Sequence, residues 1–183
     1  VGYTGLLAKF VRSKRADIGL VFDGDASRCL AVDENGDIID GDQIMAILSL
    51  YYKREVRLKK DTVVITDLSN LGFRHFASMN NIRVSTSKPG ERSIVEKLLD
   101  GGYMMGGEQN GRIIFSDVST TCDGLLTGLR LLSALKNSGK KLSGLASAME
   151  KYPQVMINVS IRPEYKELWK NNSDITDLIE KKQ

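Results

Sequence analysis

The chain has 183 residues, of which 42% are hydrophobic and 27% are charged, enough to bury one core, or one domain plus part of another. The formal net charge is only +3 and basic residues alternate with acidic ones, so nothing favours a nucleic-acid partner. The sequence has no long apolar span and no secretory signal, and we expect no membrane partner.

The two cysteines, Cys29 and Cys122, lie far apart in the sequence and do not form a metal-ligand pair. Such cysteines are typical of small buried side chains in a reducing compartment, so we expect a cytoplasmic protein. The first residue is Val1 rather than Met, which suggests a trimmed or excised segment.

The first expected elements are a helix, a strand and a hairpin. Apolar spacing predicts a helix over residues 5–15, and the apolar run at residues 18–22 predicts a strand covered on both faces. Asn35-Gly36 is a strong hairpin signal between strands expected at residues 29–32 and 37–39.

The loop after the first strand carries two carboxylates around a glycine. Gly24 allows a tight turn that brings Asp23 and Asp25 round one point, where they repel each other unless a cation lies between them. Arg28 adds a forked donor suited to a phosphate or a carboxylate. The loop therefore predicts Mg²⁺ beside a phosphorylated ligand.

Three other interpretations of this loop are open. An EF-hand would use Asp23, Asp25, Ser27 and Glu34, but Arg28 replaces its required glycine and the entering segment is strand-like. A phosphatase of the haloacid dehalogenase type would use Asp23 as nucleophile and Asp25 as acid/base, but no convincing acidic pair follows downstream. The third interpretation is an acidic turn in solvent.

The next segment begins with a helix and continues as an alternating pattern. Asp40 and Gln43 predict a capping box, and we place a domain boundary near Gly41. From residue 61 strands alternate with helices, which indicates a largely parallel sheet with helices on its faces. The expected strands are residues 62–66, 82–86, 103–106, 112–116 and 155–161, and the expected helices are residues 70–79, 92–99, 123–135 and 142–149.

Four leucines share one face of the helix expected over residues 123–135, and we expect this stripe to belong to the core. They are Leu125, Leu129, Leu132 and Leu135. The charged C-terminal segment predicts a helical tail without a core of its own.

Two further loops carry residues suited to ligands. Glu108 and Asn110 lie among glycines and would project as an acceptor and a donor for adjacent sugar hydroxyls, or else satisfy the backbone of a hairpin turn. The turn at residues 88–92 has Lys88 and Arg92 at its ends, which suits a phosphate, although a solvated helix N-terminus explains it equally well.

Several motifs, in their order and spacing, resemble those of the bacterial phosphoglucosamine mutases, a family of the α-D-phosphohexomutase superfamily. They are residues 23–28, 32–36, 40–44, 69–72, 106–109 and 119–121. The resemblance covers nearly the whole chain, but only part of a four-domain enzyme. It implies the end of domain 2 at residues 1–41, domain 3 at residues 42–160, and the connection into domain 4 at residues 161–183.

The resemblance also implies a fold and a metal site. The fold is three-layer α/β, with a mixed, largely parallel sheet and helices on both faces, following a partial α/β domain. Asp23, Asp25 and Ser27 would bind Mg²⁺, with Ser27 in place of an expected aspartate. Arg28 would be the catalytic residue beside the phosphoserine.

Sugar binding is implied for Gly107, Glu108 and Asn110. Several loop positions depart from the family pattern, while the motifs that predict core structure persist. The departures are Ser27, Glu91, Asn110, Arg112 and Cys122. They favour, as the alternative, a diverged and inactive relative that binds a sugar phosphate or another protein.

The implied reaction transfers a phosphoryl group from an enzyme phosphoserine to glucosamine 6-phosphate, and the resulting bisphosphate returns its other phosphate to the serine. The product, glucosamine 1-phosphate, feeds amino-sugar and peptidoglycan precursor synthesis. The phosphoserine loop has no counterpart in this sequence, so we expect the chain alone to be inactive. Its partners would be the phosphosugar, the remaining enzyme domains and, in a homodimer, a second copy.

Overall fold

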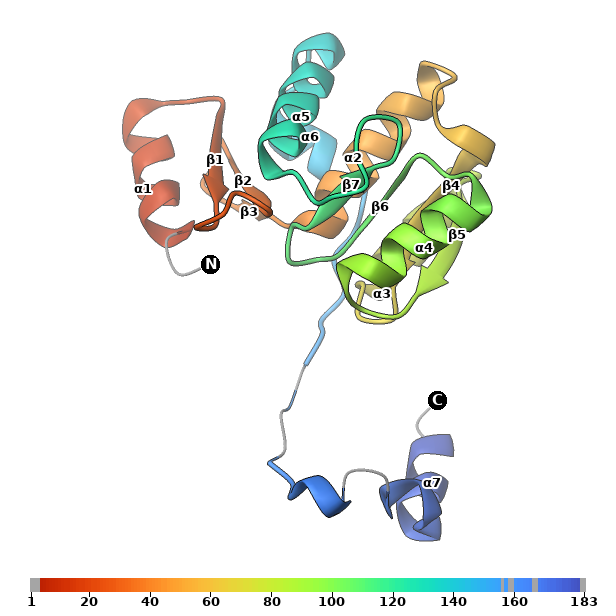
Figure 1. The fold of residues 1–183 in the computed structure, drawn as a ribbon. Helices are drawn as coiled ribbons and strands as arrows, with labels where there is room; N and C mark the ends of the chain where they lie inside the picture. The colour runs from red at the N-terminus through yellow and green to blue at the C-terminus, as the bar shows by residue number, and fades with distance from the viewer. Residues whose placement is uncertain (1–3, 156, 158–159, 166–167, 182–183) are drawn as a thin grey trace. The chain divides into compact units, whose positions relative to one another are not determined.

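The structure is a computed structural model that describes residues 4–155, 157, 160–165 and 168–181. The chain divides into two compact units, Val1–Tyr152 and Pro153–Gln183, and Figure 1 shows the elements of each. No helix in the described part of the chain combines the length and the apolar character needed to cross a membrane.

The first unit opens with a helix and a three-stranded antiparallel sheet. Helix α1 is Thr4–Lys14, and strands β1 (Ile18–Phe22), β2 (Cys29–Asp33) and β3 (Ile38–Ile39) pair in the order β1-β2-β3. The predicted helix, strand and hairpin are therefore confirmed.

The burial predicted for the first strand is wrong in part. Helices α1 and α5 (Gly124–Ser138) contact β1 and β2 from opposite faces, as Figure 1 shows. Nevertheless β1 pairs with β2 alone among the described residues, and only Gly19 in β1 is buried. An edge strand keeps one backbone side open, so its other residues are half-buried.

Helix α2 (Gly41–Arg54) joins the two sheets of this unit. The predicted capping box is present, because the Gln43 amide donates to Asp40 Oδ1 at 3.1 Å and the Asp40 amide donates to Gln43 Oε1 at 3.3 Å. Helix α2 contacts β2 on one side and β6 on the other, and Ile44, Met45 and Leu48 are buried.

The second sheet has four strands in the order β5-β4-β6-β7. Strand β4 (Thr62–Thr66) is parallel to β5 (Arg83–Ser87) and to β6 (Met105–Gly107), whereas β7 (Ile113–Phe115) is antiparallel to β6. The connecting helices include α3 (Leu71–Met79) and α4 (Glu91–Gly101). The predicted mixed, largely parallel sheet is confirmed.

Alternate residues of β4 face two different apolar layers. Val63 and Ile65 belong to the core shared with α2 and α3, while Val64 packs with Ile94 and Leu98 of α4 on the opposite face. This arrangement is the predicted three-layer α/β architecture, and Figure 1 shows α4 in front of the sheet.

The predicted core stripe of α5 is wrong for three of its four leucines, since only Leu135 packs against the core. Leu125 and Leu129 are 56% and 66% exposed, and the buried face instead carries small residues and one leucine. A Cβ added to Gly128 would lie only 3.0 Å from Leu20 Cδ1. The helix packs so closely on the antiparallel sheet that its small residues face inwards, while Leu125, Leu129 and Leu132 are exposed.

The C-terminal predictions are confirmed only in part. Helix α6 (Leu142–Ala146) is shorter than the predicted helix over residues 142–149. The strand predicted over residues 155–161 falls partly on residues outside the described ranges, and the described ones have no regular secondary structure. The second unit contains α7 (Ser173–Glu180), consistent with a helical tail.

The two faces of α5 provide a matched stability test. We expect Leu131→Ala to lower the free energy of unfolding by about 2–5 kcal/mol because the side chain is fully buried, and Leu129→Ala to lower it by less than about 0.5 kcal/mol. Urea denaturation followed by circular dichroism measures both. Equal losses would contradict the observed orientation of the helix.

Candidate functional site

The loops predicted to bind ligands lie where the strands of both sheets end. In a sheet with parallel strands, ligands bind beyond the carboxyl ends, at the point where successive connections leave in opposite directions. Strand β4 is such a point, since β5 and β6 lie on its two sides. The segments that follow β5 and β6 lie at this edge, and the segment that follows β1 meets them through a bridge between Arg28 and Arg112. The three segments define the candidate site.

The aspartate loop, residues 23–28, closes around its own carboxylates. Asp23 Oδ1 accepts from the Arg28 amide at 3.0 Å, and Asp23 Oδ2 accepts from Ser27 Oγ at 3.2 Å. Asp25 Oδ1 accepts from the Ser27 amide at 3.0 Å, and this bond holds the pKa of the exposed Asp25 carboxyl below its ordinary value. The turn is built around Ala26, whose φ is +55°.

The glycine-rich loop, residues 107–111, is also internally bonded. Glu108 is only 9% exposed; its Oε1 accepts from the Gly90 amide at 3.0 Å, and its Oε2 accepts from Asn110 Nδ2 at 3.1 Å. Asn110 Oδ1 in turn accepts from the Arg112 amide at 3.0 Å. These bonds match the alternative in which polar residues satisfy the loop itself, although a carboxylate retains further lone pairs for a ligand hydroxyl.

Backbone contacts join the two loops. Arg28 and Arg112 form an antiparallel bridge, and the Cys29 amide donates to the Gly111 carbonyl at 3.0 Å. The Gly41 amide donates to the Gln109 carbonyl at 2.9 Å. The structure thus brings the aspartate loop and the glycine-rich loop together, between β2 and the start of α2.

A third segment supports these loops, and the sequence analysis did not assign it a role at the site. The Gly124 amide at the start of α5 donates to the Ala26 carbonyl at 2.8 Å, while the Cys122 amide donates to Glu91 Oε1 at 2.9 Å. Asp123 caps α5 by accepting from the Leu126 amide at 2.8 Å. The Asp-Gly pair before a helix was the available sequence signal.

Neither cysteine is a nucleophile at neutral pH. Burial raises the pKa of the Cys29 and Cys122 thiols to about 12, and the nearby Glu91 carboxylate adds to the rise at Cys122. The prediction of a small buried side chain holds for Cys29, whereas Cys122 is only half-buried at the loop cluster.

The basic turn at residues 88–92 contacts the site through its backbone. Gly90 donates to Glu108, as described above, whereas Lys88 is exposed and Arg92 Nε donates to Glu96 Oε1 at 2.9 Å on the surface of α4. The structure therefore does not join the Lys88 and Arg92 side chains to the two loops.

The donors of the aspartate loop fit Mg²⁺ in type but are short of charge. Two carboxylates and one hydroxyl are hard oxygen ligands of the kind that Mg²⁺ prefers. However, Asp23 Oδ2 already lies 3.4 Å from Arg28 Nε, and the described residues contain no group of three carboxylate, histidine or cysteine side chains able to hold a metal.

A buried carboxylate with no role predicted from the sequence lies in the first turn of α2, next to Gly41, which contacts the glycine-rich loop. Asp42 is fully buried, and its Oδ2 accepts from the Asn70 amide at 2.7 Å. Its Oδ1 has no hydrogen-bond partner in the part of the chain that the structure describes. Burial, and then the nearby Asp40 carboxylate, raise its pKa to about 6. No local pattern distinguishes Asp42 from an ordinary acidic residue in the first turn of a helix.

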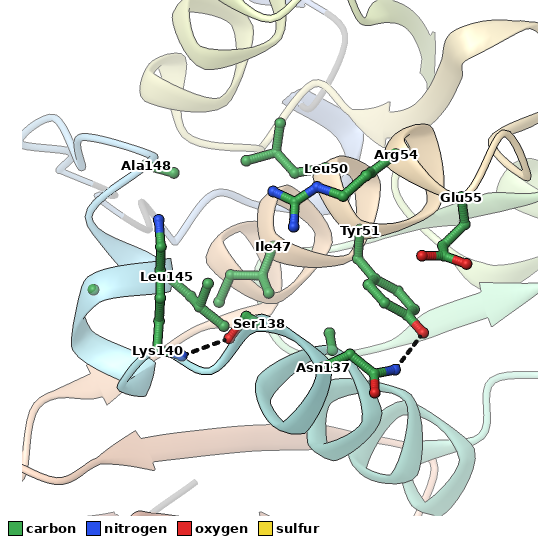
Figure 2. Close-up of a pocket in the computed structure, with 12 residues that line it drawn as sticks. Ile47, Leu50, Tyr51, Arg54, Glu55, Asn137, Ser138, Lys140, Leu145 and Ala148 are labelled. Carbon is green, nitrogen blue, oxygen red and sulfur yellow. Dashed lines mark hydrogen bonds between the residues drawn. The ribbon is translucent and has the colours of Figure 1, made fainter.

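A separate pocket lies away from these loops, between α2, α5 and α6, and Figure 2 shows it. Its volume is about 190 Å³, its floor includes Ile47 and Leu145, and Asn137 Nδ2 donates to Tyr51 Oη at 2.9 Å beside it. None of the predicted site residues lines it.

The fold and the joined loops define a three-layer α/β domain with a polar site at the carboxyl edge of its sheet. A match to the family described as phosphoglucomutase/phosphomannomutase, alpha/beta/alpha domain III, spans residues 40–152, and the chain belongs to this family.

Curated relatives extend the similarity to most of the chain. The chain is 52% identical over 160 residues to the phosphoglucosamine mutase of Ruminiclostridium cellulolyticum. This match covers 87% of the chain and 36% of that enzyme. The chain is 48% identical over 175 residues to the phosphoglucosamine mutase of Caldanaerobacter subterraneus subsp. tengcongensis, with coverages of 96% and 39%. The chain thus spans well under half the length of these relatives.

Solved structures with lower identity show the same fold. A putative phosphomannomutase from Thermus thermophilus matches with a TM-score of 0.73 at 24% identity, over 80% of this chain and 33% of that one. N-acetylphosphoglucosamine mutase of Aspergillus fumigatus, solved with GlcNAc-6P and magnesium, matches with a TM-score of 0.59 at 16% identity, over 80% and 37%.

Asp42 should make stability depend on pH in a defined direction. Between pH 4 and pH 6 the folded chain retains the Asp42 proton that the unfolded chain releases, because the pKa rises from 3.8 to about 6 on folding. The contribution of this proton to the free energy of unfolding is complete below about pH 4 and is lost as the pH rises through about 6. The difference between the folded and unfolded pKa values corresponds to roughly 3 kcal/mol.

We therefore expect the stability of the parent chain, relative to Asp42→Asn, to fall by up to about 3 kcal/mol between about pH 4 and pH 7. Urea denaturation of both forms across this range measures the difference. Parallel curves would show that Asp42 titrates at the same pH in the folded and unfolded chains.

Proposed function

We propose that this chain is part of a phosphoglucosamine mutase, which interconverts glucosamine 6-phosphate and glucosamine 1-phosphate. The observation that carries the proposal is the identity to curated phosphoglucosamine mutases over 87% and 96% of the chain. The phosphoryl group would come from a phosphoserine in another part of the enzyme, and a sugar bisphosphate would be the intermediate.

The loops of this chain would bind and orient the substrate. Glu108, held by Gly90 and Asn110, would accept hydrogen bonds from sugar hydroxyls through its remaining lone pairs. Gly107 would belong to the same sugar-binding loop, where the missing side chain lets the backbone of Arg112 approach. Arg28 would lie beside the phosphate. Such fixed donors and acceptors favour the reaction mainly by positioning.

Asp23, Asp25 and Ser27 would hold Mg²⁺, which offsets charge on the transferring phosphoryl group when bound. Support comes from their convergence on one point through hydrogen bonds within the loop. Ser27 supplies a neutral oxygen, so we infer weak binding by this chain alone, strengthened when a phosphate contributes a further negative oxygen.

Lys88 and Arg92 would assist phosphate binding only after a change of side-chain conformation, since Arg92 now pairs with Glu96. We further propose domain boundaries near residues 41 and 160, a cytoplasmic location, and assembly with the remaining enzyme domains, in a monomer or a homodimer. The family match over residues 40–152 supports the first boundary most closely.

The alternative is a diverged relative that binds a sugar phosphate without turnover. Two observations favour it: Ser27 lacks the charge of an aspartate, and the Asn110 side chain is already bonded to Glu108 and to the Arg112 amide. Both changes lie in the loops that would contact substrate or metal, so they bear on activity rather than on folding.

Activity of a chimera separates these proposals. The chain alone should show no turnover with glucosamine 6-phosphate and a bisphosphate activator, because it carries no phosphoserine loop. Replacing the matched segment of the Ruminiclostridium cellulolyticum enzyme with this chain should give an active mutase, measured as glucosamine 1-phosphate formed. Chimeras with Ser27 or Ser27→Asp that bind glucosamine 6-phosphate without turnover would instead support the inactive relative.

The Ser27→Asp variant also tests the metal site directly. A third carboxylate should tighten Mg²⁺ binding by at least about tenfold in calorimetric titration, while Ser27→Ala should give no gain. Without metal the third carboxylate adds repulsion, so Ser27→Asp should melt at a lower temperature than the parent chain and gain more on adding Mg²⁺. Equal affinity in all three forms would show that residue 27 does not face the metal.

A further inference from the structure

Two arginines lie opposite each other where the aspartate loop meets the strand that follows the glycine-rich loop. Arg28 and Arg112 are the two partners of an antiparallel bridge. Residues directly opposite in such a bridge project to the same side, with Cβ atoms about 4.5–5.5 Å apart, and like charges in this arrangement repel. This pair therefore needs negative charge nearby.

The charge that these arginines require is only partly supplied within the described chain. Both side chains have a buried Nε atom that makes no hydrogen bond to any residue in the described ranges. Arg28 Nε is 3.4 Å from Asp23 Oδ2, whereas Arg112 has no ion pair with any residue that the structure describes. A buried N–H group without an acceptor is unfavourable, and here it leaves the positive charge of the pair incompletely compensated. Both arginines are only half-buried, so an anion can approach the exposed part of each side chain and offset this charge.

The nearest candidate carboxylates already have partners. Glu108 accepts from Gly90 and Asn110, and Glu91 accepts from the Cys122 amide. These bonds join the carboxylates to neutral donors, two of them in neighbouring loops, and neither carboxylate forms an ion pair with Arg112 among the described residues.

The backbone holds both arginines in place. The Arg28 amide donates to Asp23, and the Arg112 amide donates to Asn110 Oδ1. The start of α5 lies against Arg28, because a Cβ added to Gly124 would be 2.5 Å from the Arg28 carbonyl oxygen. The backbone positions of the two arginines are thus fixed before an anion binds, which lowers the entropic cost of binding one.

We propose that Arg112 and Arg28 together bind the phosphate dianion of a phosphomonoester. Two guanidinium groups carry two positive charges and two forks of N–H donors. They match the double charge and the three terminal oxygens of a phosphomonoester better than the single charge and two oxygens of a carboxylate. The inference rests on the proposed function for the source of the phosphate, which is either the phosphosugar beside Glu108 or an enzyme phosphoserine. It assigns a role to Arg112, one of the positions that depart from the family pattern.

Calorimetric titration of the whole chain with inorganic phosphate tests the pair. Arg112→Gln should weaken phosphate binding by at least about tenfold, and Arg112→Lys should weaken it less, because the charge remains but the fork is lost. Arg74→Gln is the matched control: Arg74 is exposed, donates to Thr86 Oγ1 at 3.0 Å, and should bind phosphate as the parent chain does.

Thermal melting separates lost binding from lost folding. Without phosphate, Arg112→Gln should melt no lower than the parent chain, because one of two repelling charges is gone. With phosphate, the parent chain should gain more than the variant. No phosphate binding by the parent chain, or equal binding by Arg112→Gln, would overturn the proposal.

Two further ligands identify the source of the phosphate. Tighter binding of glucosamine 6-phosphate than of O-phosphoserine, with the difference abolished by Glu108→Gln, supports the sugar phosphate; equal binding of the two supports the phosphoserine. An active chimera with phosphate binding insensitive to Arg112→Gln would overturn this inference alone. An inactive chimera with binding that depends on Arg112 would overturn only the proposed turnover.

Discussion

The candidate site depends on close backbone contact between the starts of two helices and the loops that they support. A Cβ added to Gly41 would lie 2.1 Å from the Glu108 carbonyl oxygen, and one added to Gly124 would lie 2.5 Å from that of Arg28. Since neither position has room for a side chain, amides at both helix starts reach the loops directly. The N-terminal sheet and the four-stranded sheet are thereby joined at the site.

These contacts leave the loops organised before any ligand binds. Asp23 and Asp25 accept from groups of their own loop, and Glu108 is held from two directions. Ser27 contributes to this geometry through its hydroxyl and its amide, and it adds no charge to the loop. The framework of the two loops therefore depends on hydrogen bonds within the folded chain itself.

Charges elsewhere in the first unit are arranged around the same helix. Lys151 Nζ lies 2.5 Å from Asp40 Oδ2 at the start of α2, and Asn70 contacts both the carbonyl and the amide of Tyr152. Asp42 lies between these groups, fully buried. The start of α2 therefore contacts the glycine-rich loop, the loop after β4 and the end of the compact unit, so a change in its charge affects three segments together.

Local chemistry made much of the fold predictable. The Asp40 and Gln43 capping box, the hairpin at Asn35-Gly36 and the alternation of strands and helices depend on neighbours close in sequence, and the clustered motifs located both loops. Tertiary packing alone decided which face of α5 is buried, because helical spacing identifies a stripe but not the surface that receives it, and small residues allowed the closer approach. The burial of Asp42 and the pairing of Arg28 with Arg112 also depend on tertiary packing. Both result from backbone segments that are distant in the sequence and meet only in the folded chain, so residue spacing does not reveal them.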